Sequence, residues 1–148
     1  ENGQKKSEGN FKDGKKDGKW TAWYDNGQTR IEGNYIDGKF NGKEIRWHNK
    51  AHKDTEINYK DGVLVGNTKF KYYENGQMES VRIYQDDRLN GKSTFWYKNG
   101  QKFAEGNYKD DKKEGIWTFW NEDGQIEGEA IFKDNECISG DCDYFKNQ

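Results

Sequence analysis

The sequence contains no proline, only two cysteines and one methionine, and few aliphatic residues. Leu, Ile, Val and Phe together account for 22 of the 148 residues. So small a share is typical of disordered chains, because little apolar surface is available to offset the loss of chain entropy on folding. The absence of proline, the formal net charge of only −2 and the aromatic content of 16% oppose disorder. We therefore expect a folded protein in which aromatic rings replace an aliphatic core.

Length and charge limit the classes of protein that the chain can belong to. The 148 residues fit one domain, and the near-neutral charge offers no general attraction to nucleic acid or to an anionic membrane. No stretch approaches the roughly 20 apolar residues of a transmembrane helix. The chain begins at Glu1 and its only methionine is Met78, so we expect a trimmed or mature form without its export signal, if it had one. A cytoplasmic and an exported location both stay open.

One pattern recurs every 24 or 25 residues along the whole chain. It divides the sequence into six copies, near residues 2–25, 26–49, 50–74, 75–98, 99–122 and 123–147. The tenth position of every copy is aromatic: Phe11, Tyr35, Tyr59, Tyr84, Tyr108 and Phe132. An Asp follows two positions later, then a Gly, and then a further aromatic residue: Trp23, Trp47, Tyr72, Trp96, Trp120 and Phe145. Such regularity indicates a single repeat domain over residues 1–148, in which each copy contacts mainly its neighbours.

Each copy is typical of a β-hairpin followed by a turn into the next copy. The Asn-Gly and Asp-Gly pairs at the joins predict type I′ turns, and the Asp-containing segment within each copy predicts a longer loop. Gly and Asn recur every few residues and no apolar stripe of period 3.6 is present, so helix is disfavoured. The sequence therefore predicts an all-β fold, an elongated open antiparallel sheet of six β-hairpin repeats with about twelve strands.

Alternation along the second strand of each copy separates two rows of aromatic residues. The uniform row comprises Trp23, Trp47, Trp96 and Trp120, and we expect it to form a buried ladder together with the tenth-position aromatics. The variable row, on the opposite face, comprises Trp20, Tyr24, Phe95, Tyr97, Trp117 and Phe119. In the second copy the variable row contains Glu44, Arg46 and His48 instead, so we interpret it as the partner-binding surface. The alternative is that these rings only pair across strands and cover the back of the sheet.

The segments "NGQKKSEGNFKDGKKDGKWTAWYD" (2–25) and "NGQKFAEGNYKDDKKEGIWTFWNE" (99–122) resemble the MORN repeat variant. The resemblance is weakest at Lys50–Glu74 and in the last copy. It implies an open sheet of hairpins that binds a partner. The chain is similar to the bacterial YwqK-like antitoxin family, which implies a toxin as protein partner, whereas other arrays of this kind are exported to the cell surface. Phosphatidylinositol phosphate kinases also carry MORN repeats, so a lipid-kinase-related or phospholipid-binding fragment is a remote alternative.

No pattern in the sequence predicts catalysis, a cofactor or a metal site. Neither a phosphate-binding loop nor a dinucleotide fingerprint opening a helix is present. The Asp residues recur at every turn, which favours a role in turn formation over acid–base chemistry. His48 and His52 lack a third ligand nearby, and the acidic segment 133–145 lacks the residue order of a calcium loop. We therefore predict a non-catalytic module that binds another protein.

Cys137 and Cys142 lie on either side of Gly140. They could face each other across the final hairpin loop at a separation that suits a disulfide. A disulfide would favour an oxidising compartment, and hence the exported alternative, whereas a reduced pair would leave both locations open.

Overall fold

The computed structural model describes residues 5–48 and 52–145, with side chains as far as residue 143. The chain divides into two compact units, Glu1–Thr68 and Lys69–Gln148, which we call unit 1 and unit 2 and describe separately. The predicted copy boundaries at residues 2, 49–50 and 147 and the side chain of Phe145 lie outside the described part. The assignment of residues 1–148 to a single repeat domain stays a prediction.

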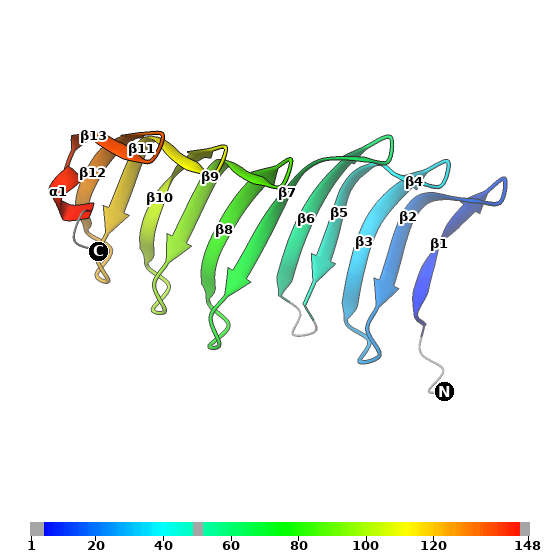
Figure 1. Ribbon diagram of the computed structural model, residues 1–148. Coiled ribbons are helices and arrows are strands. Elements are labelled where there is room, and N and C mark those ends of the chain that lie inside the picture. The colour runs from blue at the N-terminus through cyan, green and yellow to red at the C-terminus, as the bar shows by residue number, and fades with distance from the viewer. Residues whose placement is uncertain (1–4, 49–51, 146–148) are drawn as a thin grey trace. The chain divides into compact units, whose positions relative to one another are not determined.

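Unit 1 is an antiparallel sheet of hairpins (Figure 1). Its strands are β1 (Ser7–Lys12), β2 (Lys15–Trp23), β3 (Thr29–Ile36), β4 (Lys39–Phe40), β5 (Gly42–Trp47) and β6 (Lys53–Lys60). They pair in the order β1-β2-β3-β5-β6, and the short β4 pairs with β3. A further strand, β7 (Val63–Tyr72), contains the boundary between the two units. Strands that are neighbours in sequence are therefore also neighbours in space.

Unit 2 repeats this arrangement. It contains β8 (Met78–Gln85), β9 (Arg88–Trp96), β10 (Lys102–Lys109), β11 (Lys112–Trp120), β12 (Ile126–Lys133), β13 (Glu136–Gly140) and the single helical turn α1 (Cys142–Phe145). The strands pair in chain order from β8 to β13, and every pairing is antiparallel. The predicted all-β class and the open antiparallel sheet of hairpins are confirmed. The sheet has thirteen strands, because Asn41 separates β4 from β5 within one predicted strand.

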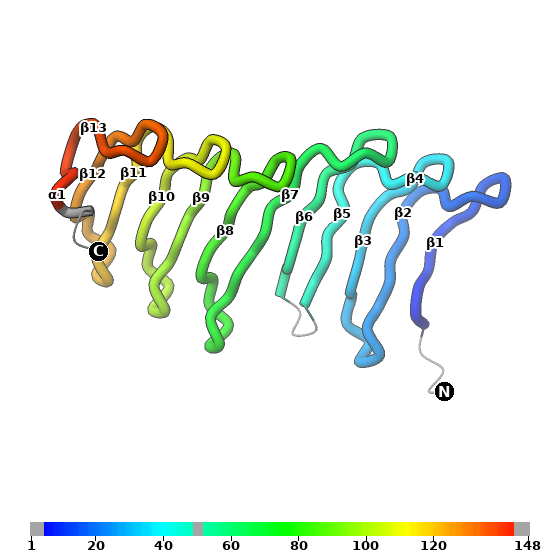
Figure 2. Tube along the Cα trace, in the orientation of Figure 1, coloured from blue at the N-terminus to red at the C-terminus, as the bar shows by residue number. Residues whose placement is uncertain are grey.

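The two ends of the hairpins carry different turns (Figure 2). Within a copy, both central turn residues have positive φ, as at Asp13 (50°) and Gly14 (76°), which defines the type I′ hairpin. At the join between copies, Tyr24 N–H donates to Gln28 O and Gly27 N–H donates to Tyr24 O, a three-residue loop with a glycine bulge. The predicted turn types were thus exchanged. Asn26 Oδ1 accepts the N–H of Gln28, and only Gly27 of this loop takes a positive φ.

Each unit has one face that contains the core and one that contains lysine–glutamate ion pairs. In unit 2 the core face contains Ala104, Trp117, Phe119, Ala130 and Phe132 as one buried cluster. The ion-pair face contains Glu105, whose carboxylate lies 2.8 Å from Lys92 and 2.9 Å from Lys102. In unit 1 the same face contains Lys19–Glu32 and Lys43–Glu56 pairs at 2.8 and 3.0 Å. Lysine on a second strand therefore pairs with glutamate on the first strand of the next copy.

The uniform row does not form the buried ladder. Trp96 and Trp120 are half-buried on the ion-pair face, where the Lys102 ammonium lies 5.3 Å from the Trp120 ring. The tenth-position aromatics pack instead with the variable row: the ring centroid of Trp117 lies 5.0 Å from that of Tyr108 and 6.4 Å from that of Phe132. The predicted partnership of the tenth-position aromatics with the uniform row was therefore wrong.

Glycine explains why the variable row has the buried rings. Gly106 on β10 lies directly beneath the Trp117 ring, and a Cβ atom there would clash with the indole. Gly9 lies in the same way beneath Trp20 in the first copy. Because the glycine leaves room for a ring to lie flat on the backbone, the indole buries more area on this face than on the other. The Trp117 indole N–H also donates to Asn107 O, at 3.1 Å.

Candidate functional site

A hollow of about 240 Å³ lies on the core face of unit 2. We call it the Lys113 recess; its lining residues are Phe95, Phe103, Ala104, Tyr108, Lys113, Trp117 and Phe119. Phe95 stacks on Trp117 with ring centroids 6.3 Å apart, and Phe103 meets Phe119 edge to face at 6.4 Å. Since each wall ring rests on a buried ring, the shape of the recess is set by packing.

Lys113 is the charged group of the recess. Its ammonium lies 4.9 Å from the Trp117 ring, 4.9 Å from the Phe132 ring and 5.7 Å from the Phe119 ring. Burial lowers the pKa of Lys113 from its ordinary value. Among the residues that the structure describes, no carboxylate forms an ion pair with this ammonium. Within the described part of the chain, the groups that stabilise this charge are therefore ring faces.

A second cation adjoins the recess. The Arg82 guanidinium lies 5.1 Å from the ring of Phe95. Arg82 pairs with Ser93 across β8 and β9, at the positions that Gly106 and Trp117 occupy in the next copy. The long side chain and the small one have thus exchanged strands relative to the fifth copy. Within residues 5–48 and 52–145, the buried Nε of Arg82 and Oγ of Ser93 have no hydrogen-bond partner.

The lysine and the tryptophan occur together in the first and fifth copies. In the first copy the Lys16 ammonium lies 3.9 Å from the Trp20 ring, as Lys113 lies over Trp117 in the fifth copy. The second copy has Phe40 in place of the lysine and Glu44 in place of the tryptophan. Our reading of the sequence missed Lys113. The motif Lys-acid-Gly-x-Trp, shared by residues 16–20 and 113–117, is the signal that could have identified it.

The variable row contains two buried rings and four half-buried ones. Trp117 and Phe119 are only 1% and 5% exposed, so their predicted place on an exposed binding patch was wrong: neighbouring strands contribute Gly106, Ala104 and Ala130 beneath and beside them. Trp20, Tyr24, Phe95 and Tyr97 are half-buried.

Tyr24 and Tyr97 link successive copies through their hydroxyl groups. Tyr24 donates to the backbone carbonyl of Trp47 at 2.7 Å, and Tyr97 donates to that of Trp120 at 2.9 Å. Tyr73 donates to Trp96 O in the same way, at 2.6 Å. These hydroxyls satisfy carbonyl groups at the ends of strands, so Tyr24 and Tyr97 have a structural role that the alternation pattern did not indicate.

Glu44 shows that the variable row is also packed in the second copy. Its side chain is fully buried and forms a hydrogen-bonded ion pair with Arg46. Burial raises the pKa of Tyr35, and the negative charge of Glu44 raises it further. This position is therefore packed without an aromatic ring, because the carboxylate takes the buried place that an indole takes in other copies.

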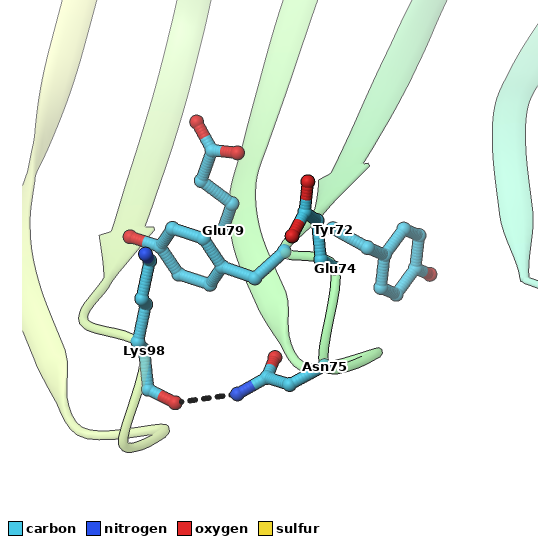
Figure 3. Close-up of a pocket in the computed structure, with 6 residues that line it drawn as sticks. Tyr72, Glu74, Asn75, Glu79 and Lys98 are labelled. Atoms are coloured by element: carbon cyan, nitrogen blue, oxygen red, sulfur yellow. Dashed lines mark hydrogen bonds between the residues drawn. The ribbon is translucent and has the colours of Figure 1, made fainter.

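A more polar hollow of about 440 Å³ lies at a join turn of unit 2. It is lined by Tyr72, Tyr73, Glu74, Asn75, Glu79 and Lys98 (Figure 3). The Asn75 amide donates to Lys98 O at 3.0 Å and connects two successive join turns. The Glu79 carboxylate lies 2.5 Å from the Lys71 ammonium, so its charge is already compensated. In Figure 3 the Tyr72 ring points away from Lys98.

A disulfide joins Cys137 on β13 to Cys142 on α1, with Cα atoms 5.6 Å apart, so it links the last strand to the helical turn that follows rather than crossing the hairpin loop. The pairing that the sequence left open is therefore present in the structure. A hollow of about 380 Å³ beside it is lined by Glu127, Gly140, Asp141, Cys142 and Asp143. Over the described ranges, no group of three or more His, Cys, Asp or Glu side chains is placed to hold a metal ion.

These repeated hairpins define a class of repeat protein with a known family profile. The MORN repeat variant matches residues 16–37, 66–86, 89–110 and 113–134, more than half of the sequence, so the chain belongs to this family. Repeats of this family are generally non-catalytic modules that bind proteins or membranes. No curated protein matches the chain.

Among solved structures, the chain is similar to one described as the crystal structure of a GtfA/B complex bound to UDP and GlcNAc. The sequence identity is 14% and the TM-score is 0.31; the match covers 79% of this chain and 22% of that chain. So weak a likeness carries no functional argument. In the described part of the chain, none of the helices is long and apolar enough to cross a membrane.

Proposed function

We propose that the chain is a non-catalytic module that binds another protein through the core faces of its units. The observation that supports this is the partial exposure of rings on these faces, such as Trp20 in unit 1 and Phe95 and Phe103 in unit 2. A single-layered sheet leaves such rings half-solvated, and burying them against a partner is favourable. Aromatic residues and arginine are also the residues most enriched at protein interfaces.

The more specific role that we propose is that of an antitoxin or immunity component with a toxin as partner. The protein encoded by the gene next to its own is the first partner to test. We expect the two proteins to elute as one complex in size-exclusion chromatography and to bind in isothermal titration calorimetry.

Two variants test whether the core face is the surface that binds the partner. Phe95→Ser should weaken this complex at least tenfold, because it removes a ring from the core face. Ile131→Ser, which removes a 40% exposed apolar side chain from the ion-pair face, should leave the affinity unchanged. Equal loss in both variants, or loss that tracks the unfolding midpoint, would contradict this assignment.

An exported surface module is a second candidate, favoured by the Cys137–Cys142 disulfide. Disulfides persist in oxidising compartments and are rare in reducing ones. Alkylation of cells with a thiol reagent, followed by mass spectrometry of the chain, tests this candidate. Unmodified, disulfide-linked cysteines support export, whereas two alkylated cysteines support the antitoxin role in a reducing cytoplasm.

A further inference from the structure

We propose that the Lys113 recess receives a carboxylate side chain, Asp or Glu, from the protein partner, and that Lys113 is its counter-ion. This inference rests on the proposed function, because it assumes a protein bound to the core face of unit 2. It adds the chemistry of the recognised group and the residue that recognises it.

The charge of Lys113 favours an acidic ligand. Lys113 is half-buried among the rings of Trp117, Phe119 and Phe132, and no described carboxylate pairs with it. A bound carboxylate would accept a charge-assisted hydrogen bond from the ammonium, which ring faces cannot replace. Removing water from an unpaired cation is costly, so a partner that covers this face without an anion would be disfavoured. The recess therefore selects for a negative group.

The size of the recess favours a single side chain. The volume of about 240 Å³ lies below the roughly 300–1,000 Å³ of small-molecule sites, so the recess suits one side chain better than a cofactor. The rings of Phe95, Phe103 and Tyr108 can contact the methylene groups of an acidic side chain while its carboxylate meets Lys113. A phosphate dianion would bring two negative charges to one lysine within apolar walls and leave one of them uncompensated.

The neighbouring cation, Arg82, indicates a second acidic residue in the partner. Arg82 lies against Phe95, which forms one wall of the recess, and its buried Nε lacks a hydrogen-bond partner among the described residues. A second acidic residue near the first could pair with the rest of the Arg82 guanidinium. We therefore expect the partner segment to contain two acidic residues flanked by apolar ones.

Capped peptides with the full chain test the proposal directly. The probes are Phe-Glu-Phe and its isostere Phe-Gln-Phe, titrated to the limit of their solubility and followed by NMR of lysine side chains labelled at the ε-carbon. We expect the glutamate peptide to bind at least tenfold more tightly and to raise the pKa of Lys113, since a carboxylate favours the charged form of lysine. Equal binding of the two peptides, or an unchanged Lys113 pKa, would overturn the proposal.

Matched variants distinguish the contribution of Lys113 from that of other lysines. Lys113→Gln should abolish the preference for glutamate, and Lys113→Arg should retain it. Lys16→Gln removes the equivalent lysine over Trp20 in unit 1 and should leave the preference intact. If Lys113→Gln fails to fold, the change in the Lys113 pKa of the unaltered chain on addition of the glutamate peptide still decides whether Lys113 binds the carboxylate.

Two further outcomes distinguish this proposal from the one on which it rests. If the neighbouring gene product binds the Lys113→Gln variant as tightly as the unaltered chain, the recess assignment is wrong and the protein-binding function stands. If that product does not bind at all, the antitoxin role fails while the peptide titration still tests the recess. Binding to phosphatidylcholine–phosphatidylserine vesicles that depends on Lys113, without a preference for the glutamate peptide, would show a membrane ligand and overturn the proposal.

Discussion

Asp111 and Leu89, which are 22 residues apart, form a reciprocal pair of hydrogen bonds between successive copies. Asp111 N–H donates to Leu89 O at 2.9 Å, and Leu89 N–H donates to the Asp111 carboxylate at 2.8 Å. Asn135 and Lys113 form the same pair, with 3.1 and 2.6 Å. In unit 1, Gly38 makes only the backbone bond, to Lys16 O at 2.8 Å. Asp and Asn thus accept a positive φ at this turn position and add a side-chain bond.

Substitution of Asp111 tests this relationship. Asp111→Gly loses the side-chain bond but relaxes the backbone, so we expect a loss of about 0.5–1.5 kcal/mol in the free energy of unfolding. Asp111→Ala loses the bond and keeps the left-handed conformation, at φ 69°, which costs about 1–2 kcal/mol more. Urea denaturation measures both, and an alanine variant as stable as the glycine variant would contradict this account.

Because the variable row is buried in place of the uniform row, we expect unequal losses of stability for two tryptophan substitutions. Trp117→Ala should reduce the free energy of unfolding by about 3–5 kcal/mol, because the indole is fully buried. Trp96→Ala should cost clearly less, because that ring is half-buried on the ion-pair face. Chemical denaturation monitored by circular dichroism compares the two variants. Equal losses would show that both rows contribute equally to the core.

Glu105 predicts a dependence of stability on pH. Burial alone would raise its pKa, but hydrogen bonds from Lys92, Lys102 and Thr94 lower the pKa to about 2, from an ordinary value of 4.5. A lowered folded-state pKa stabilises the fold fully above the ordinary value, and this contribution is lost as the pH falls through the folded value. We therefore expect the difference in urea midpoint between the unaltered chain and Glu105→Gln to shrink between about pH 5 and about pH 2. A difference independent of pH would contradict the assignment.

Ile116 interrupts the lysine–glutamate pairs of the ion-pair face. Lys19, Lys43 and Lys92 occupy the equivalent positions in other copies and pair with glutamates on the next strand. Ile116 is 61% exposed and lies opposite Ile131 on β12. Glu129, two residues before Ile131 on the same strand, occupies the position of the paired glutamates. Ile116→Lys should therefore raise the free energy of unfolding by about 0.2–1 kcal/mol at low salt. Thermal unfolding measures the change, which high salt should diminish; a lower melting temperature at low salt would contradict it.

Local residue chemistry made much of the fold predictable. The recurring Asp and Gly residues mark every turn within a copy, and alternation separates Thr118 from Trp117 and Phe119 correctly. The turn types were not predictable from the dipeptides alone, because Asn26 uses its side chain to accept Gln28 N–H and so closes a longer loop. The hydrogen bond of the Tyr97 hydroxyl was not predictable for a similar reason, because its acceptor, Trp120 O, belongs to the next copy.

The sequence by itself determined the repeat, its period, the antiparallel hairpins and the two alternating rows, since turn preference and strand alternation act over a few neighbouring residues. Only the tertiary structure decided which row is buried. That outcome depends on contacts across strands: Gly106 leaves room for the Trp117 indole, and Phe95 and Phe103 from the preceding strands complete a recess around Lys113. Burial of a ring is a property of its neighbours as much as of the ring itself.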